Sequence, residues 1–296
     1  WRRMLTGESP DSGKPFAKPF DVVACDNVVY VSDTVARSVY AFDFNAPKFF
    51  QIGMEPPGFL RKPLGLAVDA NCRLFVADQT LGMVLVYEAD GSFIKTIGTR
   101  EEFNRLSHVT VGPDGKRLYA VDTGGVEEPK KHWIRVYDIA SGEHVLNIAS
   151  RGHGDGELNL PRDAEFGPDG LLYVVDGGNF RVQKFTTDGE YVGQFGSIGS
   201  RSGQFSRPKG IAINAEGHVM VSDTAFGNFQ IFTPEGELLT FIGGRSEQGG
   251  AGLFMLPAGI DVDKSGRIYF VGQFFRKVDI FRPVDLNTKL VELSTK

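Results

Sequence analysis

The sequence predicts an all-β fold, a six-bladed β-propeller of four-stranded antiparallel blades, on three observations. First, one phrase recurs along the chain, most clearly as Pro208-Lys-Gly-Ile-Ala-Ile followed by Val-Met-Val-Ser-Asp223. Second, the residues that end this phrase are spaced by 45, 44, 54, 47 and 49 residues, a period typical of propeller blades. Third, each repeat holds four short strand-like segments and no sustained 3.6-residue periodicity, which indicates strands without helices. The end positions are Asp33, Asp78, Asp122, Asp176, Asp223 and Gly272.

The fourth repeat illustrates the individual elements. Its strand-like segments are residues 164–166, 172–175, 182–186 and 191–195, all rich in β-branched and aromatic side chains. Asp-Gly pairs between them are typical of tight hairpin turns. Four short strands repeated radially leave few exposed sheet edges, which favours a propeller.

We expect a single domain spanning residues 1–296. Its blades should start near residues 19, 63, 106, 161, 208 and 257. Residues 1–7 resemble an outer strand without a blade of its own, so we expect them to complete the last blade and to close the ring with strands from both chain ends. The tail 283–296 competes for that role, and the sequence leaves the choice open.

Composition narrows the class of protein. The net charge of −5 argues against a dedicated polyanion binder. No apolar run approaches the roughly 18 residues of a membrane span. The chain begins at Trp1 without Met, so either a targeting segment has been removed or the chain was trimmed, and we expect an extracytoplasmic location, periplasmic or secreted. Cys25 and Cys72 fall in predicted turns of adjacent repeats, where we favour two free, partly buried thiols and leave a disulfide open.

The fourth and fifth repeats carry a family resemblance. The segment Tyr173-Val-Val-Asp-Gly-Gly-Asn-Phe-Arg-Val-Gln-Lys-Phe185, followed by Gly203-Gln-Phe-Ser-Arg-Pro-Lys-Gly210, resembles the NHL repeat. The resemblance covers nearly the whole chain in six copies of unequal quality. It implies a propeller, but NHL propellers include amidating lyases, RNA-binding modules and protein-interaction platforms, so it does not name a chemistry.

The repeated Asp predicts a structural duty rather than a ring of catalytic carboxylates. An Asp at a strand end accepts backbone N–H bonds from the following loop and can pair with a nearby Arg, as Asp176 can with Arg181. Phe195, Phe205 and Phe254 recur in the same way and should fill the gaps between blades.

Function should lie where the repeats differ. The inter-blade loops and the loops between second and third strands share one face, here called the upper face. Two slots at the start of each innermost strand should point to the channel mouth on this face. Five of their residues form a predicted polar cluster for a small anion or zwitterion, or alternatively pair with one another around channel water. They are Asp21, His108, Arg162, Asp163 and Lys209.

The sequence does not support a metal or cofactor site. The amidating lyases of this family place three metal-binding histidines on inner strands, whereas the first slot here has none and the second has only His108. We therefore expect no metal, no cofactor and no catalytic residue, although His108, His153 and Asp163 leave a poorer metal site open. Asp21 and Asp163 come from roughly opposite blades, so a lyase or hydrolase at the channel mouth also stays open.

We favour a non-enzymatic interaction module that binds a protein partner through the upper face. Its hypothetical anchors break the regular repeat, because they lie in an insertion of the third repeat and in an atypical loop of the sixth. They are Trp133, Phe274, Phe275, Arg276 and Lys277. A small-molecule site or a lyase or hydrolase at the channel mouth is the alternative. RNA is a lesser one, because the charges of the predicted upper loops are mixed.

Overall fold

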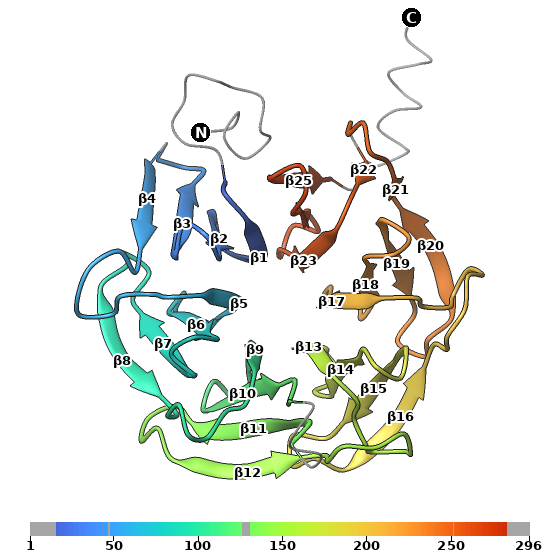
Figure 1. The fold of residues 1–296 in the computed structure, drawn as a ribbon, viewed down its shortest axis with the longest axis horizontal. Coiled ribbons are helices and arrows are strands. Elements are labelled where there is room, and N and C mark those ends of the chain that lie inside the picture. The colour runs from blue at the N-terminus through green and yellow to red at the C-terminus, as the bar shows by residue number, and fades with distance from the viewer. Residues whose placement is uncertain (1–15, 47, 126–130, 251, 283–296) are drawn as a thin grey trace, which may run out of the picture.

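Six antiparallel sheets stand in chain order around a central channel (Figure 1). The computed structural model describes residues 16–46, 48–125, 131–250 and 252–282, and every regular element in these ranges is a β-strand. The first strand of each sheet lies innermost in Figure 1. The predicted all-β propeller is therefore confirmed.

The first three blades each contain four strands. Blade one consists of β1 (Pro19–Cys25), β2 (Val28–Asp33), β3 (Ser38–Asp43) and β4 (Lys48–Ile52). Blade two consists of β5 (Pro63–Val68), β6 (Leu74–Asp78), β7 (Met83–Tyr87) and β8 (Phe93–Ile97). Blade three consists of β9 (Leu106–Val111), β10 (Arg117–Asp122), β11 (Trp133–Asp138) and β12 (His144–Ile148).

Blades four and five repeat this pattern, and the sixth sheet is shorter. Blade four consists of β13 (Pro161–Phe166), β14 (Leu172–Asp176), β15 (Arg181–Phe185) and β16 (Tyr191–Phe195). Blade five consists of β17 (Pro208–Ile213), β18 (Val219–Asp223), β19 (Asn228–Phe232) and β20 (Leu238–Ile242). Blade six shows β23 (Pro257–Val262), β24 (Ile268–Gly272) and β25 (Lys277–Phe281), preceded by the short pair β21 (Gly244–Arg245) and β22 (Leu253–Phe254).

The expected closing strand falls outside the described residues. Residues 1–7 and 283–296 were the two candidates, and neither segment belongs to the described ranges. The single domain of residues 1–296 therefore stays a prediction. The described part of the chain contains no helix that could cross a membrane.

Apolar side chains hold neighbouring blades together. Each of six buried clusters draws its residues from two adjacent blades, including one that joins blade six to blade one. In that seam Tyr269 and Val271 of β24 pack with Val29 and Val31 of β2. The described residues alone therefore pack blade six against blade one.

The Gly-rich loops before blades four, five and six share one design. Each is closed by a short parallel pairing, such as Ile198 with Phe205 and β21 with β22. Each also inserts one fully buried apolar side chain, from Leu158, Phe205 or Phe254. Phe195 is buried in the cluster between blades four and five, so the predicted inter-blade role of these phenylalanines is confirmed.

The repeated Asp ties the loop before its blade to the loop after its strand. Asp78 accepts backbone N–H bonds from Arg61 and Lys62 upstream and from Thr80 and Leu81 downstream. The other four repeated Asp side chains are equally inaccessible and accept bonds from the same two loops. Each charge-assisted bond contributes on the order of 1.5–3 kcal/mol. The predicted structural duty is confirmed.

The two cysteines form a disulfide, which corrects the expectation of free thiols. Cys25 ends β1 and Cys72 lies in the turn between β5 and β6, with Cα atoms 5.7 Å apart. The two turns belong to adjacent blades, and the ring brings them together on the face opposite the upper face. Sequence spacing alone could not reveal that approach.

Candidate functional site

A cavity of about 380 Å³ opens at the channel mouth on the upper face. The two predicted slots line it, except for Gly65. Large polar side chains of the second slot come from blades one, three and four, whereas the other three blades have Gly there. A Cβ on Gly65 would lie 2.4 Å from the His108 Cα, and one on Gly259 would lie 2.0 Å from an Asp21 carboxylate oxygen. The glycines therefore make room for the polar groups.

His108 lies between two carboxylates. Its Nε2 is 2.9 Å from Asp163 Oδ1 and its Nδ1 is 3.3 Å from Asp21 Oδ2. Burial alone would lower the pKa of His108, but Asp163 and Asp21 outweigh it and raise the pKa well above 6.5. The imidazolium form is thus favoured at neutral pH, and the three groups together carry one net negative charge.

These carboxylates also fasten the ring. Asp21 accepts a bond from the backbone N–H of Leu66 in blade two, and Asp163 accepts one from Ile211 in blade five. Asp21, His108 and Asp163 therefore pair with one another, as the alternative interpretation expected, and the two carboxylates also join neighbouring blades. Removal of either carboxylate would affect the stability of the fold as well as the binding of any ligand.

Arg162 and Lys209 have a different environment. Both are half-buried in the wall of the mouth. Burial, with Arg162 and Lys18 nearby, lowers the pKa of Lys209 to about 8 despite opposing contributions from Asp21 and Asp163. Burial, followed by Arg105 and Arg207, lowers the pKa of Arg162. The Lys209 ammonium contacts Gln273 Oε1 at 3.3 Å and lies 4.5 Å from the centre of the Phe20 ring.

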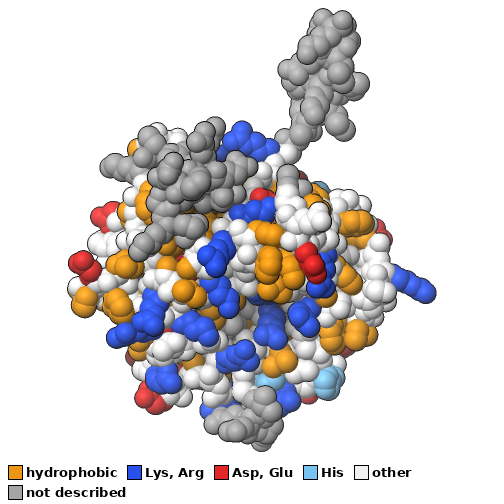
Figure 2. Space-filling view, turned by 45° about the horizontal axis from the view of Figure 1, so that its top comes forward, with side chains coloured by type: hydrophobic (Ala, Val, Ile, Leu, Met, Phe, Trp, Pro, Cys, Tyr) orange, Lys and Arg blue, Asp and Glu red, His pale blue; other side chains and the backbone are white. Residues whose placement is uncertain are grey.

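Four further cations line the same cavity, and the sequence interpretation missed them. Each is exposed and immediately precedes the first strand of its blade; they are Lys18, Lys62, Arg105 and Arg207. The available signal was the residue before the repeated Pro position, which is basic in four of six repeats. None of the six cations of the mouth forms an ion pair with a carboxylate in the part of the chain that is described. Figure 2 shows Lys and Arg side chains gathered around the middle of this face, with few acidic ones.

Further along the inner strands, carboxyl groups take the place of the cations. Glu165 and Asp261 occupy the same register on β13 and β23, four residues after the first residue of each strand. Burial, followed by the nearby Asp261 charge, raises the pKa of Glu165 to about 8. Burial raises the pKa of Asp261 to about 6, although it accepts a bond from the Ala24 backbone N–H.

The five hypothetical partner-binding residues do not form one surface. Trp133 begins β11 in blade three, whereas the other four lie in blade six, across the ring (Figure 1). Trp133 is only partly exposed and lies near the Arg135 guanidinium. Trp133 and the blade-six residues thus belong to two separate places in the ring, as the insertion and the atypical loop predicted.

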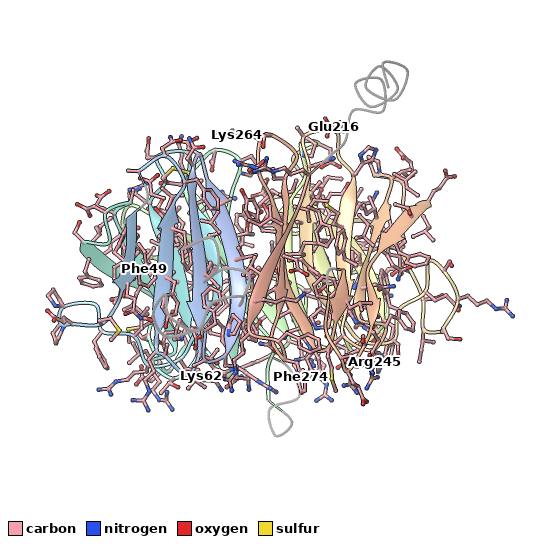
Figure 3. All side chains as sticks on the ribbon, turned by 90° about the horizontal axis from the view of Figure 1, so that it is seen from above. Phe49, Lys62, Glu216, Arg245, Lys264 and Phe274 are labelled. Atoms are coloured by element: carbon pink, nitrogen blue, oxygen red, sulfur yellow. A yellow bond between two sulfur atoms is a disulfide. The ribbon has the colours of Figure 1, made fainter. Side chains whose placement is uncertain are left out.

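The blade-six loop is only partly available for contact. Phe274 is 50% exposed and packs edge-on against Phe275, which is partly buried, and Arg276 is exposed. Figure 3 places Phe274 and Lys62 on the same face, which is at the bottom of that view, opposite Lys264. Lys277 is buried, bonded to Asp279 and to the Gly250 carbonyl, so its place among exposed anchors is a correction.

Within the described ranges, no group of metal-binding side chains converges in the channel. His153 is exposed and bonds to Asn179, so the alternative set of His108, His153 and Asp163 does not share an ion position among the described residues. The described group with suitable spacing contains Cys25, Asp26 and Cys72, whose two sulfurs are already joined.

No protein-family model matches the chain, and no curated protein matches it. Solved structures share the fold at low identity. A gluconolactonase from Xanthomonas campestris aligns with TM-score 0.67 and 17% identity over 89% of this chain and 85% of its own. Virginiamycin B lyase from Staphylococcus aureus aligns with TM-score 0.63 and 14% identity over 90% of this chain and 85% of its own. Kuenenia stuttgartiensis hydrazine synthase aligns with TM-score 0.63 and 15% identity over 94% of this chain and 99% of its own. These likenesses establish the propeller fold alone.

Proposed function

We propose that this protein binds a small anionic molecule at the channel mouth on its upper face. The observation that carries the proposal is the set of six cations around a 380 Å³ cavity, none of which pairs with a carboxylate among the described residues. Small-molecule sites typically have volumes of about 300–1,000 Å³. A chain of net charge −5 that gathers six cations at one hollow favours an anion there.

The lowered pKa values of Arg162 and Lys209 support the proposal. Half-buried cations that repel one another destabilise the charged forms, and a bound carboxylate or phosphate would relieve that repulsion. Anion binding should therefore be accompanied by proton uptake on Lys209. Affinity should fall as the pH rises through about 8, where the free protein loses that proton.

Titration calorimetry with citrate and with inorganic phosphate, at about 50 mM NaCl and near-neutral pH, tests the proposal. We expect Arg162→Gln combined with Lys209→Gln to weaken binding at least about tenfold. Lys264→Gln, on the opposite face, is the matched control and should bind as the wild type does. The proposal fails if neither anion binds the wild type, or if the double variant binds equally well.

An enzymatic use of the same pocket is the second candidate. The gluconolactonase and the lyase are enzymes on this fold, and His108 places a proton-bearing group in the mouth here. Acid release from gluconolactone, measured for the wild type and for His108→Gln, tests it. Release by the wild type alone would assign the protein an enzymatic reaction, and no release by either would leave binding as the function.

Protein recognition by the upper face remains a proposal, as does the NHL relationship. The observation in its favour is the exposed Phe274 beside the exposed Arg276. Partner capture from the native source should be lost in Phe274→Ser without a change in melting temperature. Retention of every partner by the variant would contradict this role for the loop.

We also propose an extracytoplasmic location. The Cys25–Cys72 disulfide supports it, because disulfides persist in oxidising compartments. Thiol labelling of protein from the native source should find both cysteines blocked before reduction. Labelling of both without reductant would contradict the proposal.

A further inference from the structure

We propose that the ligand of the channel mouth is a compact molecule with at least two separated anionic groups, carboxylate or phosphate. One group contacts Arg162 and Lys209 inside the mouth, and another reaches the exposed rim formed by Lys18, Lys62 and Arg105. This inference rests on the proposed function and adds the chemical class of the ligand.

The net charge of the mouth is the first argument. Six cations and two carboxylates line the cavity, a net charge of +4 when His108 is neutral and +5 when it is protonated. Both carboxylates are already engaged by His108. A single carboxylate or monoanionic phosphate neutralises one charge and would leave at least three positive charges facing one another.

The placement of the cations is the second argument. Lys18, Lys62 and Arg105 belong to the consecutive blades one, two and three, and they are exposed. Arg162 and Lys209 belong to blades four and five and are half-buried within their strands. Blades four and five stand across the channel from blades one and two (Figure 1). Lys18, Lys62 and Arg105 thus lie nearer the solvent than Arg162 and Lys209 and belong to other blades, whereas Arg207 is an exposed cation that precedes blade five.

The shape of the site favours a small molecule over an anionic polymer. The inner strands form a ring around the central channel (Figure 1). The cations lie at or just before the starts of these strands in blades one to five, instead of along a groove that a chain could follow. Polymer-binding proteins track the backbone with a continuous charged groove and stacking aromatics. Phe20 is the aromatic side chain of the mouth within the described residues, and it already lies under the Lys209 ammonium.

A matched carboxylate series tests the inference by titration calorimetry. Acetate, succinate and tricarballylate carry one, two and three carboxylates, and inorganic phosphate and a short oligouridylate are the comparison probes. We expect affinity to rise at least about tenfold from acetate to succinate, and by a similar or larger factor from succinate to tricarballylate. The salt dependence should become steeper along the series.

Rim variants separate the two groups of cations. Lys18→Gln combined with Lys62→Gln should abolish most of the gain from acetate to tricarballylate and should weaken acetate binding by a clearly smaller factor than tricarballylate binding. Both side chains are exposed, so an unchanged melting temperature verifies the fold.

The outcomes distinguish this inference from the proposed function. Equal affinity for all three carboxylates would overturn the inference and leave anion binding intact. Tighter binding of oligouridylate than of tricarballylate would overturn it in favour of a polymer. Absence of binding by every probe would remove the proposed function itself.

Discussion

Carboxylates and cations of the central channel differ in how the fold uses them. Asp21, Asp163 and Asp261 each accept a hydrogen bond from a backbone N–H of the next blade in the ring. Arg162 and Lys209, at the mouth, have no carboxylate partner among the described residues. The acidic groups therefore join blades, whereas the basic groups contribute little to holding them.

This difference separates stability from function within one channel. A group whose hydrogen-bonding capacity is used by the neighbouring blade is costly to remove. A half-buried cation without a partner opposes folding unless a ligand neutralises it. The variants below should therefore affect stability in different directions, according to whether the group bonds to a neighbouring blade or carries a charge that burial disfavours.

The largest expected effect is that of Asp163→Ala. It removes the 2.9 Å contact with His108 and the bond from Ile211, and it leaves the imidazole buried beside one carboxylate. We expect the free energy of unfolding to fall by about 3–5 kcal/mol. Urea denaturation measures it. A loss below about 1 kcal/mol would show that the carboxylate does not join the blades.

The second effect is a pH dependence with a defined sign. The pKa of His108 is raised in the folded state, so its protonation stabilises the fold. This stabilisation is complete below pH 6.5, the pKa of the unfolded state, and is lost as the pH rises through the pKa of the folded state. Glu165 acts in the same direction, because burial raises its pKa from 4.5 in the unfolded state to about 8 in the folded state. Unfolding free energy should therefore decline as the pH rises from about 5 to about 8.

Glu165→Gln isolates one contribution to that slope. At pH values above about 8 the variant should be more stable than the wild type by about 1–2 kcal/mol, allowing for screening by channel water. Near pH 4 the two should be equal, because Glu165 is protonated in both folded and unfolded states. Urea denaturation at both pH values measures the difference. Equal stability at both would show that burial does not disfavour the ionised carboxylate.

A smaller effect, opposite in sign to that of Asp163→Ala, is expected for Lys209→Met. At neutral pH the wild-type ammonium is half-buried near Arg162, and Met fills the same space without charge. We expect the unfolding free energy to rise by up to about 1 kcal/mol, with a larger gain at low salt. Thermal melting at two salt concentrations is the measurement. A clear loss of stability would mean that the contacts with Gln273 and Phe20 outweigh the repulsion.

The smallest effect should come from an exposed pair outside the channel. Lys264 and Asp26 lie 3.4 Å apart, with side chains 89% and 67% exposed. Lys264→Gln should change the unfolding free energy by less than about 0.5 kcal/mol, by urea denaturation. A larger loss would weaken the contrast between buried and exposed charges on which the other predictions depend.

The repeat predicted most of the fold because each copy contains the same strand and turn signals. Strand-end Asp, turn Gly and alternating apolar residues recur in register, so one copy confirms another. The same register placed Asp21, His108, Arg162, Asp163 and Lys209 at the channel mouth.

The errors arose where structure depends on a neighbouring blade. Cys25 and Cys72 are 47 residues apart, and only the ring geometry makes them adjacent. Lys277 could have been recognised as buried, because it occupies the repeat position of Arg181, five residues after the strand end. In blade four, Arg181 bonds to Asp176. In blade six, Gly272 occupies the position of that Asp, and Lys277 instead bonds to Asp279 and to the Gly250 carbonyl.

The disulfide has a consequence for how the chain tolerates a break in its backbone. Every residue from Asp26 to Asn71 lies between the two bonded cysteines, including the exposed loop around Met54. A protease that cuts once in that loop would produce two fragments that still migrate as one molecule until a reductant is added. A cut in the loop between blades four and five would release separate fragments on denaturation. The segment from Asp26 to Asn71, which holds three strands of blade one and the first strand of blade two, is thus protected against a nick that would divide the later blades.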